Sequence, residues 1–410
     1  MKCPNFFRAS TFLLAALAVG ITALACTTAG NAQTFTVLHN FAGALDGANP
    51  MNGLTIDAAG NLYGTASAGG RRVSGCENYE GTYGCGTVFE MKPYGSSWLF
   101  KPLYEFPGGA NNSNPVFGVV FGPDGALYGE AGTGVYRLTP LPSYCTDWMC
   151  SWQENLLYTF QDQPDASAPS SRLAFDATGS MYGVSYFGGV YNNGAIFQLT
   201  HGSGGWTESV IHSFNSEGGL GQGLPEGSLV IDHSGDLYGT TDCSATLGCF
   251  WGAVWELQPS QSGWNLTNLY QWGSGDGYQP VGLISDSSGN LYGTDFGVDT
   301  IPGAVYELSP SNGGWNYTEL HEFQIGDLAN GLVMDSAGNL YGGDFEYGYG
   351  YIFKLSKSGG VWTFTTVHNF SGPDGEFPQG PIVIDRNGNL YGTTIKGGAY
   401  GYGVVWKITP

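Results

Sequence analysis

Short apolar runs separated by glycine-containing turns follow one another along almost the whole chain, and four such patterns recur in the same order. The first pattern is a run such as Leu54–Ile56, and the second, as in Asn61–Thr65, reads Asn-Leu-Tyr-Gly-Thr. The third is typified by Gly86–Met91, and the fourth has a Trp followed eight residues later by Phe or Trp, as in Trp98 and Phe106. Runs of this length with alternating apolar and polar positions predict β-strands, so each repeat is expected to form four strands.

An eight-residue signature, Asp57–Gly64 in its first copy, connects the first two patterns and occurs seven times. An Asp side chain can accept a backbone N–H in an Asx-turn, and a Gly three residues later can take a left-handed conformation. The spacing lacks the dense Asp and Asn positions of a calcium loop, so we interpret the signature as a turn. The second copy has Gly122 in place of Asp. The copies end at Gly64, Gly129, Gly183, Gly239, Gly293, Gly342 and Gly392.

The third pattern carries one aromatic side chain at the same position in every repeat. Stacked sheets need one such side chain per repeat to fill the space between them, so we assign this position to the core rather than to a binding surface. The side chains are Phe89, Tyr136, Phe197, Trp255, Tyr306, Phe353 and Trp406.

The two ends of the repeat region complement each other. Residues 34–41 match the fourth-strand pattern, and residues 403–410 match the third-strand pattern. The stretches from Tyr391 to Pro410 and from Gln33 to Tyr63 together amount to 50 residues, the spacing of the neighbouring repeats. A closed ring joins its ends in this way, whereas an open solenoid does not require it. The sequence therefore predicts an all-β, seven-bladed β-propeller of four-stranded blades, closed by pairing of the N-terminal strand with the C-terminal three strands.

Residues 1–32 have the features of a secretory signal peptide, which leaves 33–410 as a single propeller domain. Lys2 and Arg8 give a basic start, the apolar run 10–25 is short for a membrane span, and small residues precede Gln33. A lipoprotein signal with acylation at Cys26 is the alternative, although the residues before Cys26 match that signal poorly. Since no later run could span a bilayer, we expect a secreted, extracellular or periplasmic protein.

Composition and charge exclude several classes of function. Hydrophobic residues make up 42% of the chain and charged residues 11%, which favours a folded protein over disorder. Without the leader the chain has 11 Lys and Arg against 34 Asp and Glu, a net charge of −23. This acidity excludes nucleic acid and anionic membrane surfaces as partners, because both require basic side chains.

Six cysteines remain after the leader and lie in three close pairs, each within a loop insertion. Pairing within each loop is the simplest of the fifteen arrangements that six cysteines allow, and it fits an oxidising compartment. No metal site is expected, because there is no C-x-x-C and no nearby pair of histidines. The expected disulfides are Cys76 with Cys85, Cys145 with Cys150 and Cys243 with Cys249.

The loops between the second and third strands are long and rich in aromatic residues, and they share one face of a propeller with the loops between the fourth and first strands. Aromatic side chains beside carboxylates suit a carbohydrate or a peptide, although packing of the loops on one another is the alternative. The candidate ligand-binding residues are Tyr83, Tyr186, Tyr191, Trp251, Phe296, Tyr347, Tyr349, Tyr400 and Tyr402. The carboxylates are Asp46, Asp165, Asp276, Asp327 and Asp374.

A catalytic site on a symmetric scaffold must break the symmetry. Glu130 stands where other repeats have Thr, Val or Gly, and Arg172 stands where most have Gly, Ser or Pro. These two residues lie in consecutive repeats and are weak catalytic candidates as an acid–Arg pair, with a structural ion pair as the alternative. Four histidines share one fourth-strand position with tyrosines and are interpreted as structural: His39, His212, His321 and His368.

The recurrent GLxxDxxGNLYGT…GG…GTVFELSP…W…LHxF, as in Gly331–Asp344 or Gly380–Thr394, resembles the GloVer tandem repeat of secreted bacterial "choice-of-anchor" proteins. The similarity covers essentially all of residues 34–410, and it implies no catalytic residues. Members of that family often carry a C-terminal anchor or sorting segment, whereas this chain stops at Pro410 inside the predicted propeller. Shorter stretches resemble NHL-type repeats and, at Phe121–Gly125, virginiamycin B lyase-type propellers.

These observations favour a secreted, non-enzymatic binding protein that recognises an extracellular glycan or protein through its aromatic and acidic loop face. An extracellular lyase or hydrolase with a site at the channel mouth is the alternative, and a purely structural cell-surface protein is the second alternative. The familiar motifs of serine hydrolases, zinc peptidases, P-loop proteins and dinucleotide-binding proteins are absent from the sequence. No cofactor is expected, and the chain is expected to be a monomer.

Overall fold

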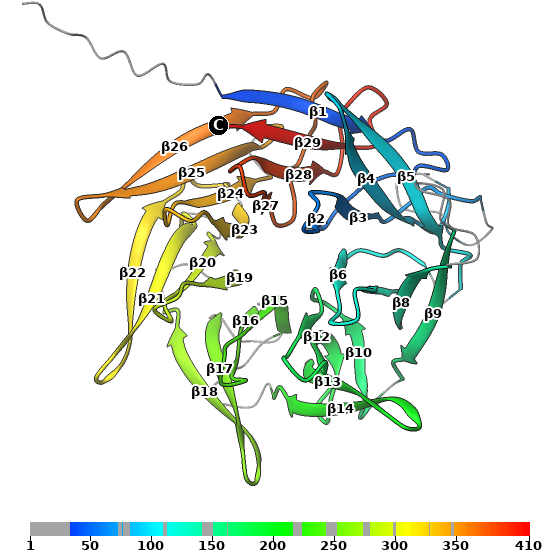
Figure 1. The fold of residues 1–410 in the computed structure, drawn as a ribbon. Coiled ribbons are helices and arrows are strands. Elements are labelled where there is room, and N and C mark those ends of the chain that lie inside the picture. Colours follow the sequence, from blue (N-terminus) through cyan, green and yellow to red (C-terminus); the bar gives the residue numbers. More distant parts are fainter. Residues whose placement is uncertain are drawn as a thin grey trace, which may run out of the picture. The chain divides into compact units, whose positions relative to one another are not determined.

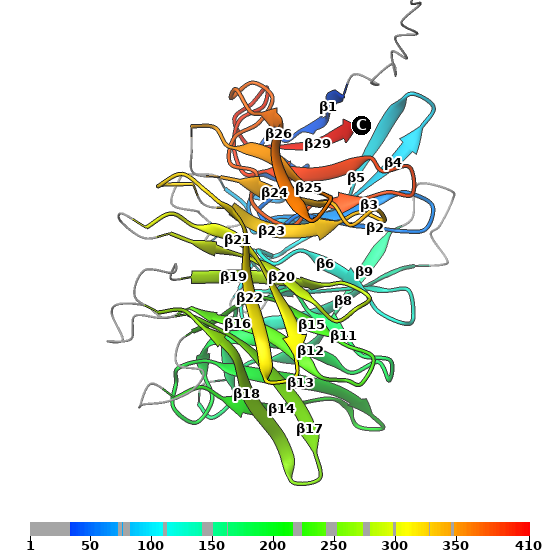
Figure 2. The ribbon, with the colours of Figure 1, turned by 90° about the vertical axis from the view of Figure 1, so that its left-hand side faces the viewer.

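The computed structural model describes residues 33–72, 76, 83–109, 113–141, 151–161, 163–215, 224–242, 252–273, 279–297, 301–327, 329–345 and 348–410. Gln33–Pro410 form one compact unit. Antiparallel sheets follow one another around a central channel as the blades of a seven-bladed propeller, as predicted (Figures 1 and 2). Within the described ranges, no helix has the length and the apolar composition needed to cross a bilayer.

The blades are numbered by the signature that each contains, and each begins with the strand at the channel. Blade 1 consists of β2 (Leu54–Ile56), β3 (Leu62–Ala66), β4 (Thr87–Tyr94) and β5 (Ser97–Glu105). Blade 2 consists of β6 (Val119–Phe121), β7 (Leu127–Ala131), β8 (Gly134–Pro140) and β9 (Trp152–Thr159). In blade 3 the inner position is divided between β10 (Ala166–Pro169) and β11 (Ala174–Phe175), followed by β12 (Met181–Gly188), β13 (Ala195–Gly202) and β14 (Gly205–Ser213).

The remaining blades repeat the same order. Blade 4 consists of β15 (Leu224–Ile231), β16 (Leu237–Asp242), β17 (Ala253–Ser260) and β18 (Gly263–Gln271). Blade 5 consists of β19 (Gln279–Ser285), β20 (Leu291–Phe296), β21 (Ala304–Ser311) and β22 (Gly314–Glu322). Blade 6 consists of β23 (Ala329–Met334), β24 (Leu340–Asp344), β25 (Tyr351–Ser358) and β26 (Val361–Asn369). Blade 7 consists of β27 (Val383–Ile384), β28 (Leu390–Thr394), β29 (Val404–Thr409) and the N-terminal strand β1 (Thr34–Asn40).

The ring closes as the sequence predicted. Strand β1 pairs antiparallel with β29, from Thr34 opposite Thr409 to Asn40 opposite Val404, with a register shift between Val37 and His39. Figure 1 shows the blue N-terminal strand lying beside the red C-terminal strand. Residues from both ends of the chain therefore form one blade, which covers the edge of β29 that would otherwise remain unpaired.

The core lies between the blades, and the third-strand aromatic side chains fill it as expected. All seven are buried, with at most 1% of the side chain exposed. The Tyr-Gly glycine of the signature faces the same ring: a Cβ on Gly64 would lie 2.6 Å from Phe89, and one on Gly392 would lie 2.3 Å from Trp406. Since any larger residue would collide with the aromatic ring, this glycine is required for packing within the blade.

The signature is a turn, as predicted. Oδ1 of Asp57 accepts the backbone N–H groups of Ala59 and Asn61, and Oδ2 accepts the hydroxyl of Tyr63 at 3.2 Å. The corresponding aspartates of blades 3 to 7 make the same contact with their tyrosines: Asp176, Asp232, Asp286, Asp335 and Asp385.

Blade 2 obtains the same turn from a different residue. Asp124, two positions after Gly122, accepts the Tyr128 hydroxyl at 3.1 Å and the backbone N–H of Ala126. It also forms an ion pair with Arg137 at 2.5 Å. The exception at Gly122 is therefore compensated locally by Asp124.

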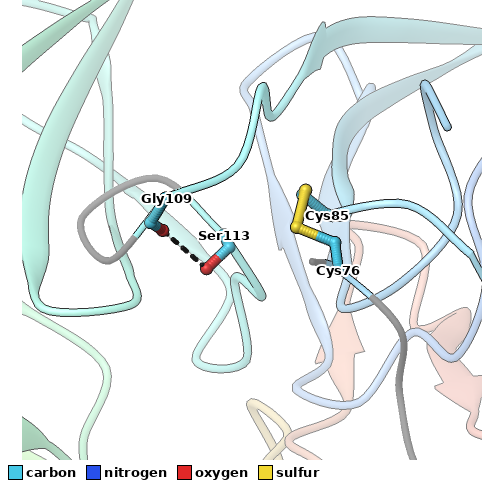
Figure 3. Close-up of a disulfide and its surroundings, with 4 residues drawn as sticks. All are labelled: Cys76, Cys85, Gly109 and Ser113. Atoms are coloured by element: carbon cyan, nitrogen blue, oxygen red, sulfur yellow. Dashed lines mark hydrogen bonds between the residues drawn. A yellow bond between two sulfur atoms is a disulfide. The ribbon is translucent and has the colours of Figure 1, made fainter. Parts of the chain in front are cut away.

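One predicted disulfide lies within the described residues. Cys76 and Cys85 are bonded, with Cα atoms 5.0 Å apart, in the loop between β3 and β4. Figure 3 shows this bond near the loop in which the Ser113 hydroxyl donates to the carbonyl of Gly109. The other two predicted pairs, Cys145 with Cys150 and Cys243 with Cys249, lie outside the described residues.

Candidate active site at the channel mouth

The central channel contains a cavity of about 520 Å³, to which the inner strands of all seven blades contribute. Its wall is mainly apolar side chains and glycine, with few polar groups. This volume lies within the range of small-molecule sites, which combine apolar walls with a few convergent polar groups. The polar residues include Asn52, Ser170, Ser171, Arg172, Glu226 and Asn330.

Glu226 places a carboxylate at this cavity from β15. Its Oε2 accepts the hydroxyl of Tyr186, a β12 residue of the preceding blade, at 2.9 Å. Its backbone carbonyl accepts the hydroxyl of Thr240, the opposite residue on β16, at 2.7 Å. Side chain and backbone are thus held from two blades, which orients the carboxylate. Burial, followed by the charges of Glu226 and Asp242, raises the pKa of Tyr186, so its hydroxyl remains a donor at neutral pH.

Asp242 supplies a second carboxylate beside this pair. It is the last residue of β16, it is 9% exposed, and its Oδ2 accepts the side-chain amide of Gln279 at 3.0 Å. Gln279 is the first residue of β19, so the two carboxylates and their two partners link blades 3, 4 and 5. Glu226 lines the cavity and can serve general acid–base chemistry, whereas Asp242 is not among the lining residues and acts on the site through the charge that it adds near Tyr186.

Arg172 also lines the cavity, and its side chain extends from blade 3 towards the two preceding blades. Its Nη2 donates to the backbone carbonyl of Leu54 at 3.1 Å and to that of Val119 at 2.6 Å, and it contacts the hydroxyl of Thr55. These acceptors belong to blades 1 and 2. Burial lowers the pKa of Arg172 to about 10, so the guanidinium remains charged at neutral pH.

Glu130 does not pair with Arg172, and the predicted acid–Arg pair is therefore wrong. Glu130 is 2% exposed inside blade 2, and neither carboxylate oxygen has a hydrogen-bond partner among the described residues. Burial raises the pKa of Glu130 well above its ordinary value. Glu130 lies on β7, the second strand of its blade, and does not line the channel cavity, whereas Arg172 lies between β10 and β11 and does line it.

The aromatic loop residues are spread over several loops and have different environments. Tyr186 is bound to Glu226, Phe296 packs edge to face on Phe345, and Tyr402 packs on Gly43. Four side chains are between 46% and 62% exposed: Tyr83, Tyr191, Tyr349 and Tyr400. Trp251 and Tyr347 lie outside the described residues. Among the described members of this set, Tyr186 is the one bound to a carboxylate of the channel cavity.

Aspartates of the loops between the fourth and first strands cap those loops. Asp46 accepts the backbone N–H groups of Ala42 and Ala44, and Asp374 accepts that of Ser371. The same carboxylates contact fourth-strand histidines, Asp46 at 3.2 Å from His39 and Asp374 at 3.0 Å from His368. Asp165 and Asp327 likewise accept backbone N–H groups and tyrosine hydroxyls, whereas Asp276 lies outside the described residues. These contacts stabilise loops and leave the carboxylates engaged.

Sequence reasoning missed Glu226 and Asp242, although both break the repeat pattern. The position six residues before the signature Asp holds Glu only in blade 4; the other repeats have Met51, Val116, Ser170, Pro280, Ala329 and Gln379. The position of Asp242 holds no other acid; the other repeats have Ser67, Gly132, Tyr186, Phe296, Phe345 and Ile395. A search of every repeat position for a charge that no other repeat has would have found both residues.

The chain belongs to the family of the Gloeobacter/Verrucomicrobia repeat, whose model matches residues 132–346, more than half of the 410 residues. This result agrees with the resemblance to the GloVer repeat. No curated protein shows significant similarity to the chain.

Several solved structures are similar to the chain at low sequence identity. A protein of Bacteroides fragilis assigned as a 6-phosphogluconolactonase is 15% identical, with 84% of this chain and 87% of that chain covered and a TM-score of 0.48. A gluconolactonase of Xanthomonas campestris is 16% identical, with coverages of 71% and 84% and a TM-score of 0.42. A protein of Thermus thermophilus assigned as an oxidoreductase (glucose dehydrogenase) is 17% identical, with coverages of 71% and 95% and a TM-score of 0.44.

The expectation of a non-enzymatic binding protein is corrected at this point. These three solved structures carry the names of enzymes rather than of binding proteins. At such identities the likeness shows the fold alone. Within this chain, the loop carboxylates that were expected to form a binding face cap their own loops instead. The alternative, an enzyme at the channel mouth, rests on the chain's own residues, of which Glu226 lines the channel cavity.

Proposed function

We propose that this chain is an extracellular hydrolase whose reaction takes place at the mouth of the central channel, with Glu226 as the general base. The observation that carries the proposal is the Glu226 carboxylate, which lines the cavity and is oriented by the Tyr186 hydroxyl at 2.9 Å. A carboxylate offers about four lone-pair sites, so one bond from Tyr186 leaves room for a water molecule.

The proposed reaction begins when Glu226 takes a proton from that water. The water oxygen then forms a bond to the electrophilic carbon of the substrate, and the bond from that carbon to the leaving oxygen breaks. Glu226 returns the proton to the leaving oxygen, so the carboxylate is regenerated and no other reactant is consumed. Because the Tyr186 hydroxyl donates to Oε2, it fixes the orientation of the Glu226 side chain towards the water.

Asp242 and Gln279 support this arrangement. The charge of Asp242 contributes to the raised pKa of Tyr186, which keeps the tyrosine protonated and able to donate. Gln279 donates to Asp242 at 3.0 Å and orients that carboxylate. We assign positioning roles to Tyr186, Asp242 and Gln279.

We further propose that the protein is secreted, with residues 1–32 removed and 33–410 acting as one domain. The Cys76–Cys85 disulfide supports this proposal, because such bonds persist in oxidising compartments. N-terminal sequencing of the exported protein tests it, with Gln33 as the expected first residue. A mature chain that begins at a lipid-modified Cys26 would contradict it.

A hydrolase screen tests the catalytic proposal. Wild-type protein is assayed on aldonolactones, aryl esters and aryl glycosides, and active substrates are repeated with Glu226→Gln. General-base catalysis typically contributes 100- to 10,000-fold, so we expect kcat to fall by about 100-fold or more. Glu307→Gln on β21, which does not line the channel cavity, is the matched control and should leave kcat unchanged. Activity that survives in Glu226→Gln, or no hydrolysis of any substrate class by the wild type, would contradict the proposal.

A further inference from the structure

Arg172 is a charged residue at a position that is otherwise uncharged. It stands four residues before the signature Asp of blade 3. The six other repeats have small residues or proline there: Gly53, Gly118, Ser228, Gly282, Gly331 and Pro381. Because a repeat scaffold does not need an arginine at this position in order to form a blade, its presence requires a local explanation.

The contacts of Arg172 hold the guanidinium without neutralising it. All three partners of Nη2, the carbonyls of Leu54 and Val119 and the hydroxyl of Thr55, are uncharged. The described ion pairs of His39, Arg137 and His368 with aspartates do not include Arg172. Nε of Arg172 is buried and has no hydrogen-bond partner in the described part of the chain.

Placing a cation at a cavity without a neighbouring anion costs desolvation free energy. Such a cation is unexpected in a chain with 34 Asp and Glu residues. Burial lowers the pKa of Arg172, which agrees with the lack of a carboxylate bound to it among the described residues. The free energy of desolvating a charge is recovered when an opposite charge binds beside it. Nη2 is engaged by its three acceptors and Nε is buried, so Nη1, which has no hydrogen bond to the described residues, is the group that can donate to a bound carboxylate.

The two charged groups of the cavity lie on different sides of it. Arg172 contacts the inner strands of blades 1 and 2, whereas Glu226 is bound to Tyr186 of blade 3 and belongs to blade 4. Arg172 contacts Leu54 and Thr55 on β2. Glu226 lies opposite Thr240 on β16, two residues before that strand ends at Asp242. A substrate whose anionic group lies at Arg172 therefore extends towards the carboxylates at the mouth.

We propose that Arg172 anchors a carboxylate group of the substrate, so that the substrate class is a small acidic sugar or a comparable hydroxy acid. This inference rests on the proposed function, because it assigns the orientation of the molecule that Glu226 attacks. The anion binds at Arg172 inside the channel, and the bond to be hydrolysed is directed towards Glu226 at the mouth.

Isothermal titration calorimetry with D-glucuronate and D-glucose tests the anchor, because the two sugars differ in the carboxylate alone. The wild type and Glu226→Gln should bind D-glucuronate with a Kd that differs by less than about threefold, and both should prefer it to D-glucose by about tenfold or more. Arg172→Ser, which introduces the residue of blade 4, should lose about tenfold or more in affinity for D-glucuronate. Near-UV circular dichroism checks that this variant is folded.

Arg172→Lys keeps the proposal testable if Arg172→Ser does not fold. Lysine retains the charge but lacks the planar fork, so D-glucuronate should bind with intermediate affinity and still be preferred to D-glucose. Equal affinities for the two sugars, no measurable binding of D-glucuronate, or unchanged affinity in both Arg172 variants would overturn the anchor. Loss of binding in Arg172→Ser together with full hydrolytic activity of Glu226→Gln would leave the anchor standing and reject the general base.

Discussion

Phe35 and His368 stack face to face across the junction that closes the ring, with ring centroids 3.7 Å apart and planes inclined by 4°. Phe35 lies on β1 and His368 lies near the end of β26 in blade 6. The same stack joins His39 to Phe100 at 3.8 Å and His321 to Phe364 at 4.0 Å. The closing junction therefore repeats the packing that is found between other neighbouring blades. His39, His321 and His368 pack between blades, in agreement with the structural interpretation of the fourth-strand histidines.

Replacement of Phe35 by Ala should destabilise the propeller at its closure. Phe→Ala in a core typically costs about 3–5 kcal/mol, and the half-buried position of Phe35 suggests a loss of about 2–3 kcal/mol in the free energy of unfolding. Denaturant unfolding measures this value. Val361→Ala, at a side chain that is 67% exposed, should change it by less than about 0.5 kcal/mol. Deletion of residues 33–42 should lower the melting temperature sharply, and an unchanged melt would refute closure through β1.

The fold followed from the sequence because its determinants are local and repeated. The Asp of each signature caps its own turn, and the Gly of each Tyr-Gly pair faces its own third-strand ring. The candidate site could not be predicted from the sequence, because its residues are distant along the chain and come together only in the folded structure. Tyr186 and Glu226 are 40 residues apart and belong to different blades. The error over Glu130 has the same origin, since sequence marks an exceptional residue without showing whether it faces the channel or the blade.

Aspartates that cap the signature turns should make the protein sensitive to acid. Burial tends to raise the pKa of Asp286, but hydrogen bonds from the side chain and backbone of Asn290 outweigh this effect and lower it below the ordinary value. Stability from such a group is complete above the unfolded pKa of about 3.9 and is lost as the pH falls through the folded pKa. Asp286→Ala should lower the free energy of unfolding by about 1–2 kcal/mol at pH 7 and by less at pH 3.

Asp124 provides an independent test of the same turn. Its pKa is also lowered, because hydrogen bonds from Arg137, Ala126 and Tyr128 outweigh burial. Asp124→Ala should therefore cost about as much as Asp286→Ala, about 1–2 kcal/mol in urea unfolding at pH 7. A negligible loss at Asp124 would contradict the conclusion that it replaces the missing signature Asp of blade 2.

Glu208 should make the protein less stable in alkaline solution. Burial, followed by the nearby charge of Asp165, raises the pKa of Glu208 to about 8. Since the unfolded pKa is about 4.3, stability is complete below that value and declines as the pH rises through about 8. Glu208→Gln should unfold like the wild type at pH 4 and melt at a higher temperature at pH 9. The gain should be on the order of 1 kcal/mol, because partial solvent exposure screens the interaction. Equal melting temperatures at pH 9 would contradict this assignment, and Glu322→Gln at an exposed residue of β22 controls for the loss of one charge.

Glu130 should lower the stability of the folded protein and should not take part in catalysis. A buried group without a hydrogen-bond partner costs about 1–3 kcal/mol, and four other repeats have Thr at this position. Glu130→Thr should therefore stabilise the protein by about 1 kcal/mol or more at pH 7 and should retain full hydrolytic activity. Because burial raises the folded pKa of Glu130, the wild type loses stability as the pH rises above the unfolded value, and the advantage of the variant should grow with pH. Loss of activity in this folded variant would restore Glu130 as a catalytic candidate.

The most direct test of the whole account is the crystal structure of Glu226→Gln with D-glucuronate bound. This variant lacks the proposed general base but is expected to bind D-glucuronate as the wild type does. The account predicts density for one molecule inside the central channel, with the carboxylate on the Arg172 guanidinium and the opposite end of the sugar near residue 226. Density at the exposed loop tyrosines Tyr191 or Tyr400, with an empty channel, would contradict it.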